Sequence, residues 1–273
     1  MIQTLSDILV VSDLDNTLLP TQQKISSCNT TMIRLFCKLG GHFTIASERS
    51  ATSVKRYLGD LQLSDPAIVC GGGVLYDFSE DCAIDTNYLD QRSATRMIVE
   101  LLPCFQHLGI EILSDNGRTY VVNPNKQLCK HAVEEAVDYV VCELCDVPGN
   151  WYKAIFWGNK DDFRLLSEIV EQRAYENANF SVVDPFCCEL LPPNITKGTA
   201  LKKLCTWTEI PLENTYAIGD YYNDLDLLAT AGHGIAIGNA VAAVQMQCEQ
   251  TVLSCTDGGV AELLYRLMKQ YSK

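Results

Sequence analysis

Two carboxylates one residue apart, Asp13 and Asp15, are the residues that most clearly point to chemistry. They directly follow Ile8–Ser12, an apolar run that predicts a short strand buried on both faces. Ligands of open parallel sheets bind beyond the carboxyl ends of the strands, so both acids would arrive where a site is expected. Burying two acids together is costly unless a cation or fixed hydrogen-bond donors compensate, and Mg²⁺ prefers oxygen ligands of this kind. The alternative is that these residues only begin a loop.

A second acidic motif follows another short apolar run near the far end of the chain. Thr215–Ile218 predicts a strand, and Gly219, Asp220 and Asp224 come after it. Gly219 permits a close backbone approach, Asp220 is a candidate metal ligand, and Asp224 lies one helical turn further on. If this strand neighbours the first one in a sheet, the two motifs would hold one cation.

Two further residues are candidates for binding a phosphate group. Lys197 opens a predicted helix, where the positive end of the helix dipole already lies. An anion between the dipole and the ammonium group would remove this electrostatic conflict, whereas the alternative is a solvated surface lysine. Ser47 follows a predicted strand and precedes a helix, so its hydroxyl and the next backbone N–H groups are suited to hold phosphate oxygens.

The elements that must position these residues follow from the spacing of apolar residues. Early in the chain we expect strands at Ile8–Ser12, Phe43–Ala46 and Ala67–Cys70, with one helix ending at Gly40 and another capped by Ser50. From Thr196 onward we expect helices at Lys197–Thr206, Asp224–Ala231 and Ala240–Gln247, strands at Thr215–Ile218, Ile235–Ile237 and Val252–Ser254, and a final helix capped by Asp257. Such alternation indicates a parallel sheet with right-handed crossovers.

The middle of the chain departs from this alternation. We expect hairpins at Val74–Ile84 and Ile110–Val122, helices through Met97 and over Gln127–Cys142 and Asp161–Ala174, and strands at Trp151–Trp157 and Phe180–Val183. This order indicates a compact α+β insertion. The expected fold class is α/β, with a discontinuous core domain of residues 1–75 and 188–273 and an inserted domain of residues 76–187.

Composition narrows the classes of partner. The formal net charge is −13, from 34 acidic and 21 basic residues, which argues against binding to nucleic acids or anionic membranes. An odd number of cysteines, 13, without a secretion signal favours thiols in a reducing compartment, so we expect a cytoplasmic protein. Cys142 and Cys145 have the spacing of half a metal site, but no second pair accompanies them in the sequence.

Taken in order, these motifs resemble the four motifs of the haloacid dehalogenase (HAD) superfamily. The matching segments are Asp13-x-Asp15-x-Thr17, the Ser47 loop, Lys197, and Gly219-Asp220-x-x-Asn223-Asp224. Gly238-Asn239-Ala240 and the segment Thr256–Ala261 are similar to the "GNA" and "DGVA" segments of the Cof-type branch, which contains sugar-phosphate and small-metabolite phosphatases. The resemblance spans nearly the whole chain. It implies a Rossmann-like parallel sheet core with an inserted α+β cap of the C2B type.

The resemblance also implies a role for each site residue. Asp13 would be the nucleophile that forms an aspartyl-phosphate, and Asp15 would be the general acid and then the general base. Phosphate binding would fall to Ser47, Lys197, Asn223 and Leu14. Mg²⁺ would be held by Asp13, Asp15 and Asp220, with Asp224 in support, and Asp15 would contribute its backbone carbonyl.

Two departures from the Cof-type pattern fall at the site. Glu48 replaces the glycine of the usual Thr-Gly-Arg, and a carboxylate facing the site would repel a phosphate group. We therefore expect the Glu48 side chain to point away from the site. Gly72-Gly73 replaces the usual Asn-Gly, which removes one amide side chain. Neither departure changes the nucleophile, the acid or the metal ligands.

The expected function is that of a Mg²⁺-dependent phosphatase that acts on a small phosphorylated metabolite. Sugar phosphates are the commonest substrates of the branch that the chain resembles. One alternative is a phosphotransferase or phosphomutase of the same superfamily, which returns the phosphoryl group to a second hydroxyl. The other alternative is a non-catalytic protein that binds a phosphate ligand on this scaffold.

Overall fold

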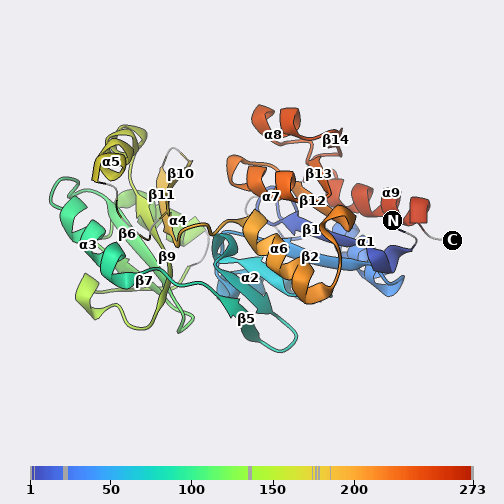
Figure 1. Cartoon of the computed structure of the whole chain (residues 1–273), viewed down its shortest axis with the longest axis horizontal. Coiled ribbons are helices and arrows are strands. Elements are labelled where there is room, and N and C mark those ends of the chain that lie inside the picture. Colours follow the sequence, from blue (N-terminus) through green and yellow to red (C-terminus); the bar gives the residue numbers. More distant parts are fainter. Residues whose placement is uncertain are drawn as a thin grey trace. The chain divides into compact units, whose positions relative to one another are not determined.

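The computed structural model describes the chain except for residues 1, 3, 21–23, 135–136, 174, 176, 178, 185 and 272–273. Two units with separate internal packing emerge: Met1–Asp85 together with Thr196–Lys273, and Thr86–Ile195 (Figure 1). The first boundary follows the hairpin that begins at Val74, because this hairpin extends the sheet of the first unit. The second boundary follows Cys187–Leu191, because this strand pairs within the second unit.

The first unit is built on an eight-stranded sheet in the order β14-β13-β12-β1-β2-β3-β4-β5. Its strands are β1 (Leu9–Asp13), β2 (His42–Ala46), β3 (Ala67–Val69), β4 (Val74–Asp77), β5 (Cys82–Thr86), β12 (Thr215–Gly219), β13 (His233–Ala236) and β14 (Gln250–Thr251). β1 pairs in parallel with β2 on one side and with β12 on the other. The chain thus winds in opposite directions from β1, which makes the carboxyl end of β1 a topological switch point.

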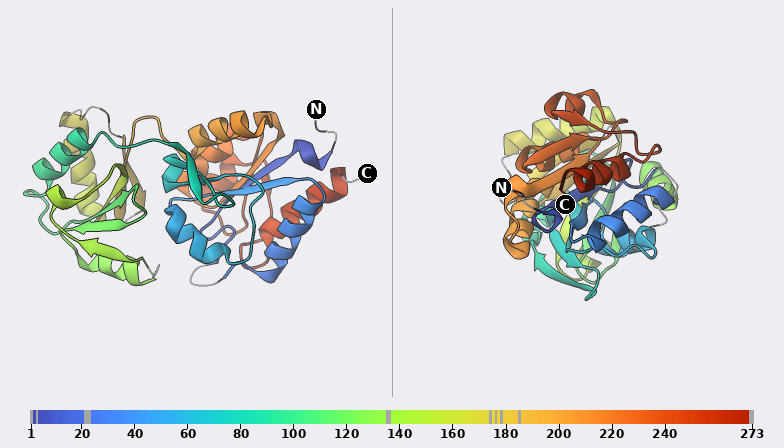
Figure 2. Two further views of the ribbon diagram at one scale, coloured as in Figure 1. Left: turned by 90° about the horizontal axis from the view of Figure 1, so that it is seen from below. Right: turned by 90° about the vertical axis from the view of Figure 1, so that its right-hand side faces the viewer.

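Helices cover both faces of this sheet. They are α1 (Ser27–Lys38), α2 (Ala51–Leu58), α6 (Lys197–Thr208), α7 (Leu225–Thr230), α8 (Ala242–Gln247) and α9 (Gly259–Tyr271). Figure 2 shows α6 and α7 on one face and α1 and α9 on the other. The predicted cap of α2 is confirmed, because the Ser50 side chain accepts a hydrogen bond from the Ser53 backbone N–H.

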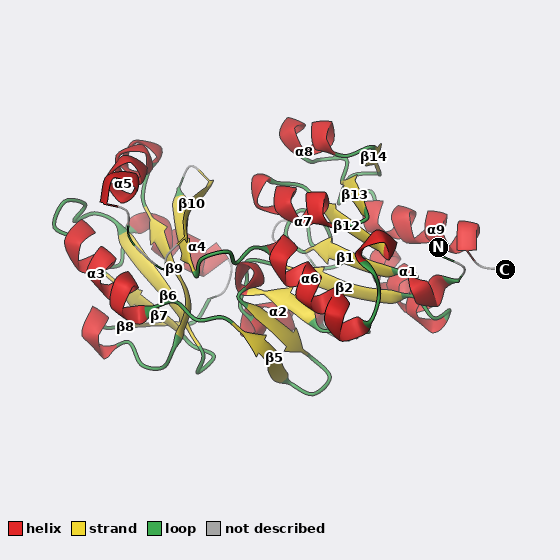
Figure 3. Cartoon of the chain, viewed as in Figure 1, coloured by secondary structure: helices red, strands yellow, loops and turns green. Residues whose placement is uncertain are grey.

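The second unit is an α+β unit with a six-stranded sheet in the order β10-β11-β9-β6-β7-β8. Its strands are β6 (Gly109–Ser114), β7 (Thr119–Val122), β8 (Tyr139–Val141), β9 (Trp151–Trp157), β10 (Asn179–Asp184) and β11 (Cys187–Leu191). Its helices are α3 (Gln91–Leu101), α4 (Lys126–Glu134) and α5 (Lys160–Arg173). Helices α3 and α5 lie on the same side of the sheet (Figure 3), where Met97 and Phe163 pack into one apolar core with Phe156 of β9.

One prediction for the second unit is wrong in part, and one of its strands was not predicted. The helix expected over Gln127–Cys142 ends at Glu134, and Tyr139–Val141 is instead the strand β8, parallel to β7. Tyr139, Val140 and Val141 are aromatic and β-branched, and such residues fit a pleated sheet better than a helix. The strand β11, which pairs with β9 and β10, has no counterpart among the predicted elements.

Two structural findings bear on the expectations drawn from composition. No helix in the described part of the chain combines the length and apolar character needed to cross a bilayer. All 13 cysteines lie in described residues, and no disulfide bond joins any of them. Cys142 and Cys145 belong to no cluster with metal-holding geometry among the described residues.

A His–Asp pair at the start of β2 makes stability depend on pH. His42 Nδ1 lies 3.0 Å from both carboxylate oxygens of Asp65. This hydrogen bond, assisted by the charge of Asp65, raises the pKa of His42 above its usual 6.5. Because the folded-state pKa is raised, the pair stabilises the fold fully below about pH 6.5 and loses this effect as the pH rises through the folded pKa.

We expect the substitution His42→Gln to lower the free energy of unfolding by about 1 kcal/mol or less, since the His42 side chain is 32% exposed. The loss should be larger at about pH 5.5 than at about pH 8.5. Urea denaturation of the wild type and the variant at the two pH values measures this loss of stability. The contributions of the other histidines cancel when the two proteins are compared at the same pH. Equal losses at the two pH values would contradict the assignment.

Candidate active site

Three adjacent parallel strands deliver the predicted site residues to one edge of the sheet. Asp13 ends β1, Asp220 directly follows β12, and Ser47 directly follows β2. The register aligns Ser12 of β1 with Ile218 of β12, so Asp13 and Asp220 emerge at the same edge, one residue apart in register. These side chains are buried because β1 and β12 are covered on both faces. The expectation that the two acid-bearing strands are neighbours is confirmed.

Lys197 and Asp224 complete the centre of this cluster. The Lys197 ammonium group donates to Asp13 Oδ1 at 2.7 Å and to Asp224 Oδ1 at 2.8 Å, and the lysine is almost completely buried. Asp224 Oδ2 in turn accepts the backbone N–H of Asp220 at 3.0 Å. Gly219 leaves the room for this, since a Cβ there would lie 2.6 Å from the same oxygen. Lys197 is therefore no solvated surface lysine.

The same three acids have the geometry of a cation site. Asp13, Asp220 and Asp224 each offer a carboxylate oxygen, and these oxygens lie within 4.8 Å of one another. Burial, together with the neighbouring Asp224 carboxylate, raises the pKa of Asp13 and raises the pKa of Asp220 to about 7. One ammonium group offsets only part of the charge of three carboxylates. The donor set of buried carboxylate oxygens fits a hard divalent cation such as Mg²⁺.

Electrostatics also fix the charge of Lys197. Burial alone would lower the pKa of Lys197, but the carboxylates of Asp13 and Asp224 raise it well above its usual value. The ammonium group therefore stays protonated across the physiological pH range. A permanent cation beside Asp13 is suited to neutralise a second anion that approaches the same carboxylate.

Asp15 lies outside the cluster of three and pairs with a residue that the sequence analysis did not single out. Arg49 donates from Nε to Asp15 Oδ2 and from Nη2 to Asp15 Oδ1, both at 2.8 Å. Such a bidentate pair holds the carboxylate in a defined orientation. The sequence contained a signal for this pair. Asp15 and Arg49 follow the ends of β1 and β2 at similar distances, and these two strands are neighbours in the sheet.

The expectation that Glu48 points away from the site is wrong. Its Oε1 accepts a hydrogen bond from Asn223 Nδ2 at 3.3 Å and lies 4.0 Å from Lys197 Nζ. The carboxylate therefore faces two residues that were predicted to bind phosphate. The physical reason is that these donors attract an anion, and Glu48 is the nearest carboxylate of this loop.

The remaining predicted residues lie around the same cluster. The Ser47 side chain is buried, and its Oγ accepts the backbone N–H of Arg49 at 3.1 Å. Leu14 is buried directly after β1, and its carbonyl accepts the backbone N–H groups that close the following turn. The Thr17 hydroxyl donates to Asp220 Oδ1 at 3.4 Å. This hydrogen bond links Thr17 of the Asp13-x-Asp15-x-Thr17 motif directly to Asp220 of the second acidic motif.

Gly72 fits closely against the start of α6. It has φ +103°, and a Cβ there would lie 2.3 Å from the Thr196 carbonyl oxygen. Thr196 caps α6 and immediately precedes Lys197, so a side chain at Gly72 would press on the start of the helix that carries Lys197. The glycine that replaces the usual asparagine therefore has a structural reason.

We expect Gly72→Ala to destabilise the fold by about 3 kcal/mol, from strain at positive φ and from the steric conflict with Thr196. Gly59→Ala is the matched control, because Gly59 also has positive φ but nothing lies within 4 Å of its added Cβ. Chemical denaturation measures both variants. The excess loss at Gly72 isolates the steric conflict, and equal losses at the two positions would refute it.

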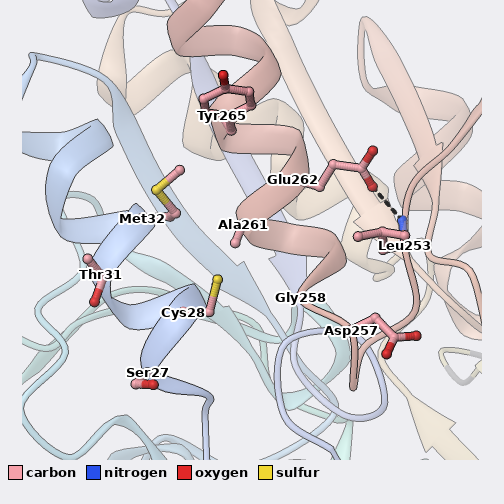
Figure 4. Close-up of a pocket in the computed structure, with 10 residues that line it drawn as sticks. All are labelled: Ser27, Cys28, Thr31, Met32, Leu253, Asp257, Gly258, Ala261, Glu262 and Tyr265. Carbon is pink, nitrogen blue, oxygen red and sulfur yellow. Dashed lines mark hydrogen bonds between the residues drawn. The ribbon is translucent and has the colours of Figure 1, made fainter.

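A surface pocket of about 480 Å³ lies apart from the predicted site residues, between α1 and α9 (Figure 4). Cys28 and Met32 of α1 face Ala261 and Tyr265 of α9 across it. Its polar lining includes the carboxylate of Glu262, which accepts the Leu253 backbone N–H at 2.7 Å. None of the predicted catalytic, phosphate-binding or metal residues lines this pocket.

Comparisons with known proteins cover almost the whole chain. A family model described as haloacid dehalogenase-like hydrolase matches residues 10–264. The HMP-PP phosphatase of Yersinia pseudotuberculosis serotype O:1b is 26% identical in an alignment of 264 positions that covers 94% of this chain and 94% of that protein. A haloacid dehalogenase-like hydrolase from Bacteroides thetaiotaomicron has a similar structure, with a TM-score of 0.84, 24% identity and coverage of 95% of this chain and 99% of that one. A sugar phosphatase of HAD subclass IIB superposes with a TM-score of 0.83 at 17% identity, over 97% of this chain and 99% of the other.

Proposed function

Because the chain belongs to the haloacid dehalogenase-like hydrolases, we propose that it is a Mg²⁺-dependent phosphatase acting on a small phosphorylated metabolite. The observation that carries the proposal is the meeting of Asp13, Asp220 and Asp224 with Lys197 at the carboxyl ends of β1 and β12. A buried carboxylate that lies beside a permanent ammonium group is suited to attack an anionic substrate. The relatives named HMP-PP phosphatase support a substrate of this chemical class.

In the proposed reaction, Asp13 attacks phosphorus and the bond to the ester oxygen breaks, which leaves an aspartyl-phosphate. Asp15 donates a proton to the departing oxygen and then removes a proton from the water that attacks the phosphoenzyme. The bond between Asp13 and phosphorus breaks in this second step, and inorganic phosphate leaves. Covalent catalysis divides one difficult hydrolysis into two easier steps, and proton transfer by Asp15 contributes about 10²–10⁴-fold.

The other site residues hold the phosphate group and the cation. Lys197 offsets negative charge on the phosphoryl oxygens, while Ser47, Asn223 and Leu14 provide further hydrogen bonds. When bound, Mg²⁺ would supply the positive charge that lets the Asp13 carboxylate approach an anionic phosphate. Asp13 and Asp220, the backbone carbonyl of Asp15 and the supporting carboxylate of Asp224 would hold this ion.

The ion pair between Asp15 and Arg49 positions the proposed acid and base. Arg49 donates one hydrogen bond to each oxygen of the Asp15 carboxylate. Each of these oxygens keeps a further lone pair that can carry the transferred proton. Arg49 in this role is a positioning residue, which holds the carboxylate in a defined orientation.

The proposal is tested by incubating the purified full chain with Mg²⁺ and a library of phosphorylated metabolites that includes HMP-PP and sugar phosphates. We expect release of inorganic phosphate from at least one member. A rearranged phosphate ester without free phosphate would favour a phosphomutase. Binding of phosphate esters without any turnover would favour a non-catalytic phosphate-binding protein.

A further inference from the structure

The Glu48 carboxylate lies at the donors that the proposed reaction uses to bind phosphate. Its Oε1 accepts a hydrogen bond from Asn223 at 3.3 Å and lies 4.0 Å from the Lys197 ammonium nitrogen. Both neighbours are donors, and a carboxylate presents oxygen acceptors to them much as a phosphate group does. The Glu48 side chain is 24% exposed, so salt and water screen its charge less than on an open surface.

The surrounding backbone makes room for this carboxylate. Gly71 has φ +65°, and a Cβ on it would lie 2.4 Å from Glu48 Oε2. The loops that carry the two residues are joined by hydrogen bonds, from the Cys70 N–H to the Arg49 carbonyl at 2.8 Å and from the Gly71 N–H to the Ser47 carbonyl at 3.1 Å. The inward orientation of Glu48 is therefore matched by a glycine on a separate, firmly attached loop.

The charges of the neighbouring groups indicate what Glu48 does there. The cluster with cation-holding geometry among the described residues consists of Asp13, Asp220 and Asp224 and does not include Glu48. The contacts of its Oε1 are instead with hydrogen-bond donors, one of them cationic. Glu48 thus behaves toward Asn223 and Lys197 as an internal anion.

On the basis of the proposed function, we propose that Glu48 weakens the binding of inorganic phosphate by competing with it for Asn223 and Lys197. A phosphate group can enter only if it displaces the carboxylate from these donors. An ester gains additional binding energy from its organic part, whereas inorganic phosphate has no such contribution. Glu48 therefore keeps the affinity for inorganic phosphate low, because this product has no organic part to offset the cost of displacement, and the return of Glu48 to the donors promotes release of the product.

The test is the affinity of the full chain for inorganic phosphate in the presence of Mg²⁺, measured by isothermal titration calorimetry. Glu48→Gln keeps the size of the side chain and removes its charge, and Glu48→Gly removes the side chain. We expect both variants to bind phosphate at least about tenfold more tightly than the wild type, because an anion near the site is lost. Circular dichroism verifies that each variant is folded.

Glu249→Gln is the matched control, because it removes the same charge from an exposed residue of the first unit. It should leave the affinity for phosphate unchanged. The inference is overturned if Glu48→Gln binds phosphate no more tightly than the wild type. It is also overturned if Glu249→Gln tightens binding equally, since the effect would then reflect overall charge.

Hydrolysis of phosphate esters, assayed separately, distinguishes this inference from the proposed function. If no ester is hydrolysed while Glu48→Gln still binds phosphate more tightly, the phosphatase proposal fails and the competition by Glu48 stands. If esters are hydrolysed but the variants bind phosphate like the wild type, the phosphatase proposal stands and the role of Glu48 is refuted. In an active enzyme, the variants should also be inhibited by lower concentrations of phosphate.

Discussion

Replacing Asp13 with asparagine is expected to lower the turnover of a phosphate monoester by at least about 10⁴-fold. The amide has nearly the same shape as the carboxylate but cannot form the phosphoenzyme. It also removes the charge that faces Lys197 at 2.7 Å, which leaves Asp224 as the carboxylate that accepts a hydrogen bond from this lysine. The rate of phosphate release from an aryl phosphate with saturating Mg²⁺ measures the effect.

Asp60→Asn is the matched control for this experiment, because Asp60 is an exposed acid outside the site. It should retain the wild-type rate. Far-ultraviolet circular dichroism and thermal melting distinguish loss of chemistry from loss of fold. Residual turnover by Asp13→Asn within about tenfold of the wild type would exclude Asp13 as the nucleophile.

Removing Mg²⁺ with a chelator is expected to lower turnover by at least about 10³-fold, and added Mg²⁺ should restore it. Without the cation, a nucleophile crowded by two further carboxylates faces an anionic substrate, and the Lys197 ammonium group that offsets the repulsion is shared between Asp13 and Asp224. The concentration of Mg²⁺ that gives half of the maximal rate reports the affinity of the site. A rate that resists the chelator would contradict the proposed cation requirement.

Asp220→Asn separates the cation site from the nucleophile. We expect it to weaken Mg²⁺ at least about tenfold, because a charged ligand becomes neutral. The melting temperature provides a readout that does not depend on activity, since an ion that binds only the folded state raises it. Mg²⁺ should raise the melting temperature of the wild type at concentrations that leave the variant unchanged. Equal shifts in both proteins would place the ion elsewhere.

Local sequence patterns predicted the elements that carry the acids proposed for catalysis and metal binding. Short apolar runs before Asp13 and Asp220 predicted buried strands, and β1 and β12 are found there. The pattern suffices because a strand buried on both faces needs consecutive apolar residues. The prediction from local patterns was wrong at Tyr139–Val141. These residues were assigned to a helix, but their aromatic and β-branched side chains form the strand β8.

The orientations of Glu48 and Arg49 illustrate what local patterns do not contain. Glu48 turns toward Asn223, which lies 175 positions further along the chain, and fits beside Gly71 of another loop. Arg49 turns toward Asp15 across the boundary between two parallel strands. Each orientation depends on which loops the sheet order brings together. The sequence offered only the repulsion between the Glu48 carboxylate and a phosphate group, and this argument predicted the wrong orientation.

By itself, the sequence determined the types of residue at the strand ends, the alternation that produces a parallel sheet, and the family resemblance. These features depend on neighbours in the chain and on the periodicity of burial. The tertiary structure alone decided that Lys197 joins Asp13 to Asp224, that Arg49 holds Asp15, and that Glu48 faces Asn223 and Lys197. The reason is that Coulomb attraction and steric fit act through space, between groups that only the folded sheet brings within a few ångströms.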